Sequence, residues 1–196
     1  LDLDGDDGDL SPTFTIADNV ALPEFELDLT GASDAVVSAG DGVTLNTITS
    51  SGEGGDTIIL GDNTTVLSNI EIGDGDNRVE IGEGALLQGS KALELGDGND
   101  TVIIGDDATI EDFDAGDGDD QITLGDGTTV EADLTLGNGR NTLVAGDDRL
   151  IPVRAMTRSR PAMTFHCRIW IWAAMPMWPP SAPSTAPGWR AAARPG

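Results

Sequence analysis

The chain contains 196 residues, with 35 acidic and ten basic side chains, a formal net charge of −25 and one Cys. A single Cys excludes an intrachain disulfide framework, and the acidic excess is the opposite of the basic surface that nucleic-acid binding requires. The chain opens at Leu1 with neither an initiator Met nor the basic and apolar segments of a signal peptide, so we expect it to be a fragment of a longer protein.

A cluster of the form Gly-x-Gly-x-Asp/Asn returns every 20 to 23 residues, and a Gly-Asp or Gly-Glu pair follows nine residues after each opening glycine. The clear copies open at Gly52, Gly73, Gly96, Gly116 and Gly137, with less regular copies at Gly31 and Gly8. Self-similarity at this period predicts a solenoid, in which each repeat is one coil. We expect residues 1–30 to form a degenerate first repeat or N-terminal edge, and residues 31–148 to form the acidic solenoid.

Apolar residues recur at fixed distances after each opening glycine, with polar or variable residues between them. The column at six residues contains Phe14, Val37, Ile58, Val79, Val102, Ile122 and Leu143, the column at eight contains Ile16, Ala39, Leu60, Ile81, Ile104, Leu124 and Ala145, and the column at fourteen contains Leu22, Leu45, Val66, Leu87, Ile110 and Val130. Alternation of this kind indicates strands with one face inward. A further apolar pair such as Ile70/Ile72 often closes the coil, which predicts three short strands per coil with Gly-Asp turns at the corners. The expected fold class is all-β, a β-solenoid of parallel β-helix or β-roll type with about seven coils and no helix.

The glycine corners carry the candidate chemistry. Residues 95–103 (LGDGNDTVI) and 115–123 (AGDGDDQIT) resemble the calcium-binding nonapeptide of the RTX, or hemolysin-type, proteins, Gly-Gly-x-Gly-x-Asp-x-apolar-x, without its first glycine. Glycines allow the backbone to curl so that carbonyls face inward, and the Asp supplies a hard anionic oxygen. The resemblance implies Ca²⁺ as the bound ion, held between successive coils by loop carbonyls and by carboxylates.

Carried over to this sequence, the resemblance implies ligand side chains at the end of each loop, with Asn as a weakened ligand and Ala35 as a lost one. The implied metal-binding positions are Gly52, Gly54, Asp56, Gly73, Gly75, Asn77, Gly96, Gly98, Asp100, Gly116, Gly118, Asp120, Gly137, Gly139 and Asn141. RTX nonapeptides follow one another directly, whereas each nonapeptide here alternates with a segment of 11 to 14 residues. This spacing favours a β-helix with loops along one edge over a two-sided β-roll.

Stacked coils bring acids such as Asp97 and Asp117 to about 5 Å, where a like-charge pair costs about 1 to 3 kcal/mol at effective dielectric constants between 80 and 20. Bound cations would remove this repulsion, and salt would screen part of it. We therefore expect folding to depend on calcium at the millimolar concentrations found outside cells. Two alternatives remain open: the corners are solvated turns of an acidic protein, or the acids form a halophile-like surface without specific sites.

Residues 149–196 have a different composition, with seven arginines, no acid, all four Trp and the pair His166–Cys167. Read from the third base of each codon, Met156-Thr157 and Met163-Thr164 both encode Asp, and Trp172-Ala173 encodes Gly. With the unconstrained third bases taken mostly as G, the shifted reading restores glycines nine and then eleven residues apart, which is the spacing within the repeats. We interpret this tail as the product of a frameshift near Asp148 and expect it to be unstructured.

If the tail is the product of a frameshift, several motifs in it carry no functional information. Its Trp and Arg residues would otherwise suggest binding to a membrane or to nucleic acid, and His166–Cys167 would suggest a metal or nucleophile pair. Residues 163–178 are too few to span a bilayer and include Arg168 and Pro176. We expect no membrane span and no nucleic-acid partner.

Residues 1–148 contain no His, Tyr, Trp or Cys, so carboxylates are the only ordinary general bases and aromatic platforms for sugars are nearly absent. Carboxylate pairs can hydrolyse glycosides, but an acid on every coil singles out no pair, and we expect no enzyme activity. A column of Thr44, Thr65, Thr109 and Thr129 is a candidate for ice or surface binding, but Ala21 and Leu86 interrupt it.

These patterns together predict a calcium-binding structural or adhesive segment of a secreted, extracellular or cell-surface bacterial exoprotein, such as an adhesin or a surface-layer protein. The expected partners are calcium ions and a cell-surface or matrix polysaccharide or protein. The alternative is an accessory calcium-binding module of a secreted polysaccharide-active enzyme, such as a lyase, epimerase or hydrolase.

Overall fold

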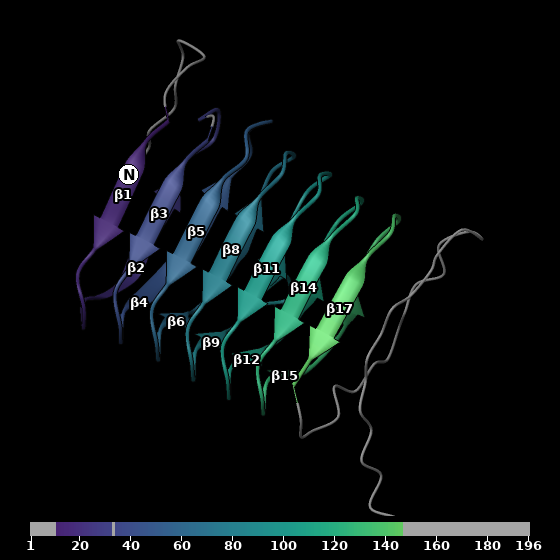
Figure 1. Cartoon of the computed structure of the whole chain (residues 1–196). Helices are drawn as coiled ribbons and strands as arrows, with labels where there is room; N and C mark the ends of the chain where they lie inside the picture. The colour runs from purple at the N-terminus through teal and green to yellow at the C-terminus, as the bar shows by residue number, and fades with distance from the viewer. Residues whose placement is uncertain (1–10, 33, 147–196) are drawn as a thin grey trace, which may run out of the picture.

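A computed structural model describes residues 11–32 and 34–146, and the tail to which the frameshift interpretation applies lies outside these residues. Within the described residues every regular element is a β-strand, and every strand pair is parallel. Each strand lies beside its equivalent in the next coil, so that the chain forms a stack of similar turns (Figure 1). The predicted all-β solenoid without helices is confirmed for this part of the chain.

One side of the solenoid is a seven-stranded sheet that receives one strand from each coil. In sheet order its strands are β1 (Thr13–Ile16), β3 (Val36–Ala39), β5 (Thr57–Leu60), β8 (Arg78–Ile81), β11 (Thr101–Ile104), β14 (Gln121–Leu124) and β17 (Thr142–Ala145). Seven passes of the chain enclose six complete turns between the first strand and the last.

The rest of each coil forms a ten-stranded sheet that divides into two branches at β4 (Thr44–Ser50). One branch continues from the first half of β4 through β6 (Thr65–Val66), β9 (Leu86–Leu87), β12 (Thr109–Ile110) and β15 (Thr129–Val130). The other continues from its second half through β7 (Ile70–Ile72), β10 (Leu93–Glu94), β13 (Phe113–Asp114) and β16 (Leu134–Thr135). On the N-terminal side β2 (Ala21–Asp28) pairs with β4 along both halves. The predicted three strands per coil are therefore present, and in the first two coils the second and third strands are continuous.

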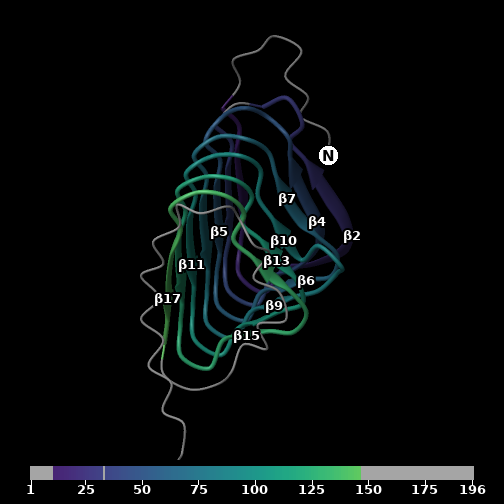
Figure 2. The same ribbon diagram turned by 90° about the vertical axis from the view of Figure 1, so that its right-hand side faces the viewer.

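The apolar columns read from the sequence are in register in the structure. Val102, for example, pairs with Val79 on one side and Ile122 on the other, and Ile104 pairs with Ile81 and Leu124. These side chains point into a narrow core between the layers seen end-on in Figure 2. Burial alternates along each strand because successive side chains of a strand point to opposite faces.

The second corner of each coil contains one residue in the left-handed backbone conformation. From the first coil onward these are Asn19, Gly42, Asn63, Gly84, Asp107 and Gly127, with φ between 54° and 71°. Glycine alternates with Asn or Asp from coil to coil, because the Asn or Asp side chain of one coil fills the space that a Cβ would need in the next. A Cβ at Gly127, for example, would lie 2.3 Å from the carboxylate of Asp107 in the preceding coil. Gly-Asp pairs thus form the corners as expected, since Gly, Asn and Asp best tolerate this conformation.

Ile103 and Ile104 are adjacent on β11, yet Ile104 is 1% exposed and Ile103 is 39% exposed. We expect Ile104→Ala to lower the free energy of unfolding by about 2 to 5 kcal/mol, because it leaves a cavity in the core. Ile103→Ala should cost about 1 kcal/mol or less, since it removes mainly strand propensity. Urea unfolding of the full chain in calcium measures both, and equal losses would contradict the inward orientation of the even-numbered residues of β11.

Candidate metal centre at the glycine corners

The side chains that end the glycine loops are buried in the solenoid. Each of them is 2% exposed or less and lies immediately before a strand of the seven-stranded sheet. They are Asp56, Asn77, Asp100, Asp120 and Asn141. Equivalent residues of neighbouring coils lie above one another, so that the five form a continuous column. We call this column the buried Asx ladder.

Each ladder side chain accepts a hydrogen bond from the backbone of the preceding coil. The distances are 2.7 Å from Ala35 N to Asp56 Oδ1, 2.9 Å from Asp56 N to Asn77 Oδ1, 2.8 Å from Asn77 N to Asp100 Oδ1, 3.1 Å from Asp100 N to Asp120 Oδ1 and 2.9 Å from Asp120 N to Asn141 Oδ1. A buried N–H without a partner is costly. The first oxygen of every ladder residue therefore holds two coils together, and even Ala35, the lost ligand of the sequence analysis, contributes its N–H.

The second polar atom of the ladder residues separates them into two kinds. Asn77 donates its Nδ2 to the loop carbonyls of Gly73 at 3.0 Å and Gly75 at 2.9 Å. Asn141 donates to the carbonyl of Leu136, and Asp56 accepts a hydrogen bond of 2.5 Å from the Ser50 hydroxyl. In these three residues the ladder is satisfied within the protein.

Asp100 and Asp120 differ, because the Oδ2 atom of each is buried and has no hydrogen-bond partner. The loop carbonyls at the positions that Asn77 bonds are those of Gly96 and Gly98 for Asp100, and of Gly116 and Gly118 for Asp120. An Asn supplies a donor to such carbonyls, whereas a carboxylate supplies only another acceptor. A proton or a cation is needed to complete the arrangement.

Burial changes the acidity of these carboxyl groups. Desolvation is the largest cause in each case, and it raises the pKa of Asp100 to about 6 and that of Asp120 to about 7. Desolvation also raises the pKa of Asp56, although the hydrogen bonds from Ser50 and Ala35 oppose the shift. The ionised forms of Asp100 and Asp120 are therefore unfavourable unless a positive charge lies beside them.

The loop glycines are required by the close approach of neighbouring coils. In the column headed by Gly54, a Cβ at Gly75, Gly98, Gly118 or Gly139 would lie between 1.7 and 2.6 Å from the carbonyl oxygen of the preceding glycine, and all four have φ between 117° and 157°. In the column of opening glycines, a Cβ at Gly52, Gly73, Gly96, Gly116 or Gly137 would meet backbone of the preceding coil within 2.7 Å. All ten glycines predicted as site residues thus lie in two stacked columns that close the loops against one another, and at the nine other than Gly54 this packing requires glycine independently of any ion.

The donors available for a cation at these corners are oxygens. In the described part of the chain, no three acidic, His or Cys side chains converge to hold a metal ion. A site here would combine one carboxylate oxygen with backbone carbonyls, which is a hard oxygen set of the kind that Ca²⁺ prefers. Asp100 and Asp120 fit this requirement, whereas Ser50 already occupies the second oxygen of Asp56.

The exposed acids of the corners also bond between coils, which the sequence analysis did not anticipate. Asp76 accepts a hydrogen bond from Asn99 N at 2.8 Å, and Asp119 accepts one from Arg140 N at 2.7 Å. Hydrogen bonds from Asn138 lower the pKa of Asp117. Backbone N–H groups thus offset part of the repulsion expected between these acids. The recurrence of acids at equivalent positions of the repeats is the sequence pattern that indicates these contacts.

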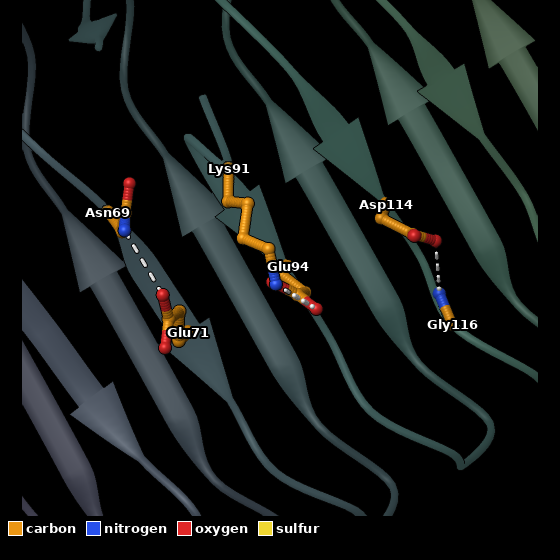
Figure 3. A network of polar contacts seen from close by, with 6 residues as sticks. All are labelled: Asn69, Glu71, Lys91, Glu94, Asp114 and Gly116. Carbon is orange, nitrogen blue, oxygen red and sulfur yellow. Dashed lines mark hydrogen bonds and ion pairs between the residues drawn. The ribbon is translucent and has the colours of Figure 1, made fainter. Parts of the chain in front are cut away.

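A third set of acids lies on the outward side of neighbouring strands β7, β10 and β13, where Glu71, Glu94 and Asp114 are in register. Figure 3 shows that each is bound within its own coil: Asn69 donates to Glu71 at 3.1 Å, Lys91 pairs with Glu94 at 2.7 Å, and Gly116 N donates to Asp114 at 3.1 Å. The second oxygen of Glu94 is buried without a hydrogen bond, but the Lys91 ammonium 2.7 Å away already supplies the positive charge beside it. None of the three carboxylates therefore needs an ion.

Comparison of the chain with family models, curated proteins and solved structures found no match. Among the described residues there is no helix long and apolar enough to cross a membrane.

The contrast between Asn77 and Asp120 predicts the effect of exchanging the two side chains. Without calcium, Asp120→Asn should raise the free energy of unfolding by about 1 to 3 kcal/mol, because the new amide could donate to the loop carbonyls equivalent to those that Asn77 bonds. Asn77→Asp should lower it by a similar amount. Urea unfolding in chelator at pH 8 measures both changes, and a destabilising Asp120→Asn would contradict the unsatisfied oxygen.

The raised pKa values predict how stability depends on pH without calcium. Between the ordinary value of 3.8 and the folded value of about 7, folded Asp120 holds a proton that the unfolded chain releases. Its contribution to stability is therefore complete near pH 4 and is lost as the pH rises through 7. The urea midpoint in chelator should fall between pH 5 and pH 8, and it should fall further for the wild type than for the Asp100→Asn/Asp120→Asn double variant. The double variant keeps every other acid. An equal fall in the urea midpoint of the two proteins would show that the exposed acids cause the pH dependence.

Proposed function

We propose that the chain is a calcium-stabilised structural segment of a secreted, adhesive bacterial exoprotein, related to the RTX proteins by its loops. The observation that carries the proposal is the pair of buried, unpartnered Oδ2 atoms of Asp100 and Asp120. The amide of Asn77 in the same column is fully bonded. A cation beside each carboxylate would supply the positive charge that the amide hydrogens supply in Asn77.

Two positions are proposed to hold the ions. At the first, Asp100 Oδ2 would act with the carbonyls of Gly96 and Gly98, and at the second Asp120 Oδ2 would act with those of Gly116 and Gly118. Bound Ca²⁺ would neutralise carboxylates whose ionised forms burial disfavours. The protein holds each carboxylate in place through its Oδ1, which accepts the N–H of the preceding coil, and the stacked glycines keep the loop carbonyls close.

A structural role agrees with the absence of His, Tyr and Cys from residues 1–148. A repetitive rod separates or displays the domains at its ends, and its length grows with the number of repeats. Calcium dependence would keep such a rod loosely folded where calcium is scarce and stiffen it outside the cell. An extracellular location would suit such a module, because calcium sites in secreted modules typically have dissociation constants of about 0.1 to 1 mM.

Calcium titration tests the proposal on the full chain. For a site with a dissociation constant of about 0.1 mM, about 10 mM calcium should raise the free energy of unfolding by about 2.7 kcal/mol. Two such sites should together give about 5.4 kcal/mol, and we expect Asp100→Asn and Asp120→Asn each to reduce this total by about half. Magnesium at the same concentration should give a smaller gain, because it requires a tighter octahedral shell and loses water reluctantly.

Asp106→Asn is the matched control, since it removes one carboxylate charge from an exposed corner of the same coil as Asp100. Asp106 accepts a hydrogen bond from Asp126 N at 2.8 Å, and an Asn oxygen can accept the same bond. The calcium gain should be unchanged in this variant. Equal reductions in Asp106→Asn and Asp100→Asn would indicate diffuse counterion binding and would overturn the proposed sites.

A further inference from the structure

The outward side of the seven-stranded sheet forms one continuous surface, which we call the neutral face. Two columns of side chains cross it in register, and the strands run side by side across the whole view in Figure 1. The first column is Thr13, Val36, Thr57, Arg78, Thr101, Gln121 and Thr142, and the second is Thr15, Ser38, Ile59, Glu80, Ile103, Thr123 and Val144. Neighbouring strands of a sheet lie about 4.8 Å apart, so the side chains are evenly spaced along the face.

The neutral face has no net charge on a chain whose acidic residues outnumber its basic ones by more than three to one. Its only charged side chains are Arg78 and Glu80, and they form an ion pair with each other. Parallel stacking does not itself exclude acids, because Glu71 and Glu94 occupy consecutive outward positions on β7 and β10. The neutrality is therefore a property of this face and not a consequence of the solenoid.

The neutral face also exposes apolar atoms beside hydroxyl groups. Among the described residues only three large apolar side chains are exposed, and two of them, Ile103 at 39% and Val144 at 46%, lie on this face. Six of its fourteen side chains are Thr, which carries a methyl and a hydroxyl on the same carbon. The face thus offers hydrogen-bonding groups and apolar contacts in alternation.

We propose that the neutral face binds an uncharged, hydroxyl-rich polysaccharide. The proposal names the partner for the adhesive part of the proposed function and rests on it. Carboxylate corners on either side of the sheet repel acidic polymers, and they attract cationic ones to themselves and away from the face. An uncharged polysaccharide matches the face, because its hydroxyls can bond to Thr, Ser and Gln while its C–H groups contact Val and Ile.

A second copy of the chain is a poorer match for the same surface. Four residues per strand and seven strands give a face of about 13 Å by about 29 Å, or roughly 380 Å², about half of what each partner buries in a standard interface. Face-to-face pairing would also bring two sets of carboxylate corners together. Charge and area therefore both favour the uncharged polymer.

Co-sedimentation of the full chain with amorphous cellulose tests the proposal, in calcium and about 0.15 M salt, where charges beyond about 8 Å are screened. We expect the wild type to sediment with the polymer. Thr101→Asp/Thr123→Asp should bind about tenfold more weakly, because charges replace two hydroxyls on neighbouring strands β11 and β14 of the face. The control Thr109→Asp/Thr129→Asp adds one Asp to each of the same two coils on the other sheet, and it should bind as the wild type does.

Competition provides a measurement that requires no variant to fold. Soluble hydroxyethylcellulose should displace the wild type from cellulose, and polygalacturonate at the same concentration should not. The proposal is overturned if the wild type stays in solution, if both double variants lose binding equally, if polygalacturonate competes, or if Thr101→Asp/Thr123→Asp instead abolishes a dimer seen by sedimentation equilibrium. Cellulose binding that persists in a chain without any calcium gain would count against the calcium sites alone.

Discussion

Every part of this structure depends on the stacking of each residue on its equivalent in the next coil at the spacing of hydrogen-bonded strands. Backbone N–H groups of one coil donate to carbonyls of the preceding coil, as in the bonds of 2.8 Å from Thr57 N to Ala35 O and from Arg78 N to Asp56 O. The repeat keeps this register over seven strands, and like side chains therefore lie above like. Stacked apolar side chains therefore form the core. Stacked polar side chains form ladders, in which each side chain must tolerate the equivalent side chain of the neighbouring coil.

Acids meet this condition in different ways at different places. Exposed corner acids such as Asp76 accept an N–H from the neighbouring coil, and Glu94 pairs with Lys91 of its own coil. Asp100 and Asp120 meet it only in part, since one oxygen bonds the preceding coil while the other has no partner. The same register that makes the fold regular thus places two incompletely satisfied carboxylates in consecutive coils, and this is where an ion would have the largest effect on stability.

The stacking rule also sorts the surface by charge. Corners accumulate carboxylates because Asp, Asn and Gly accept the turn conformations there, whereas the outward side of the seven-stranded sheet contains β-branched residues and a single ion pair. The polyanionic corners and the uncharged sheet therefore occupy separate parts of the surface. In the proposed function, ions bind at the corners and an adhesive partner binds at the flat side.

The sequence by itself determined the solenoid, the strand columns and their register, because a period of 20 to 23 residues combined with inward alternation leaves one way to bury Val79, Val102 and Ile122 together. It also located the loop that ends in each Asp or Asn. Only the tertiary structure decided which of these side chains are satisfied. Asp56 meets Ser50 from the preceding strand and Asn77 meets the carbonyls of its own loop, while Asp120 meets neither kind of partner. These differences arise from contacts between residues at different positions of the repeat. The repeat pattern shows only which residues occupy the same position, so it does not predict such contacts.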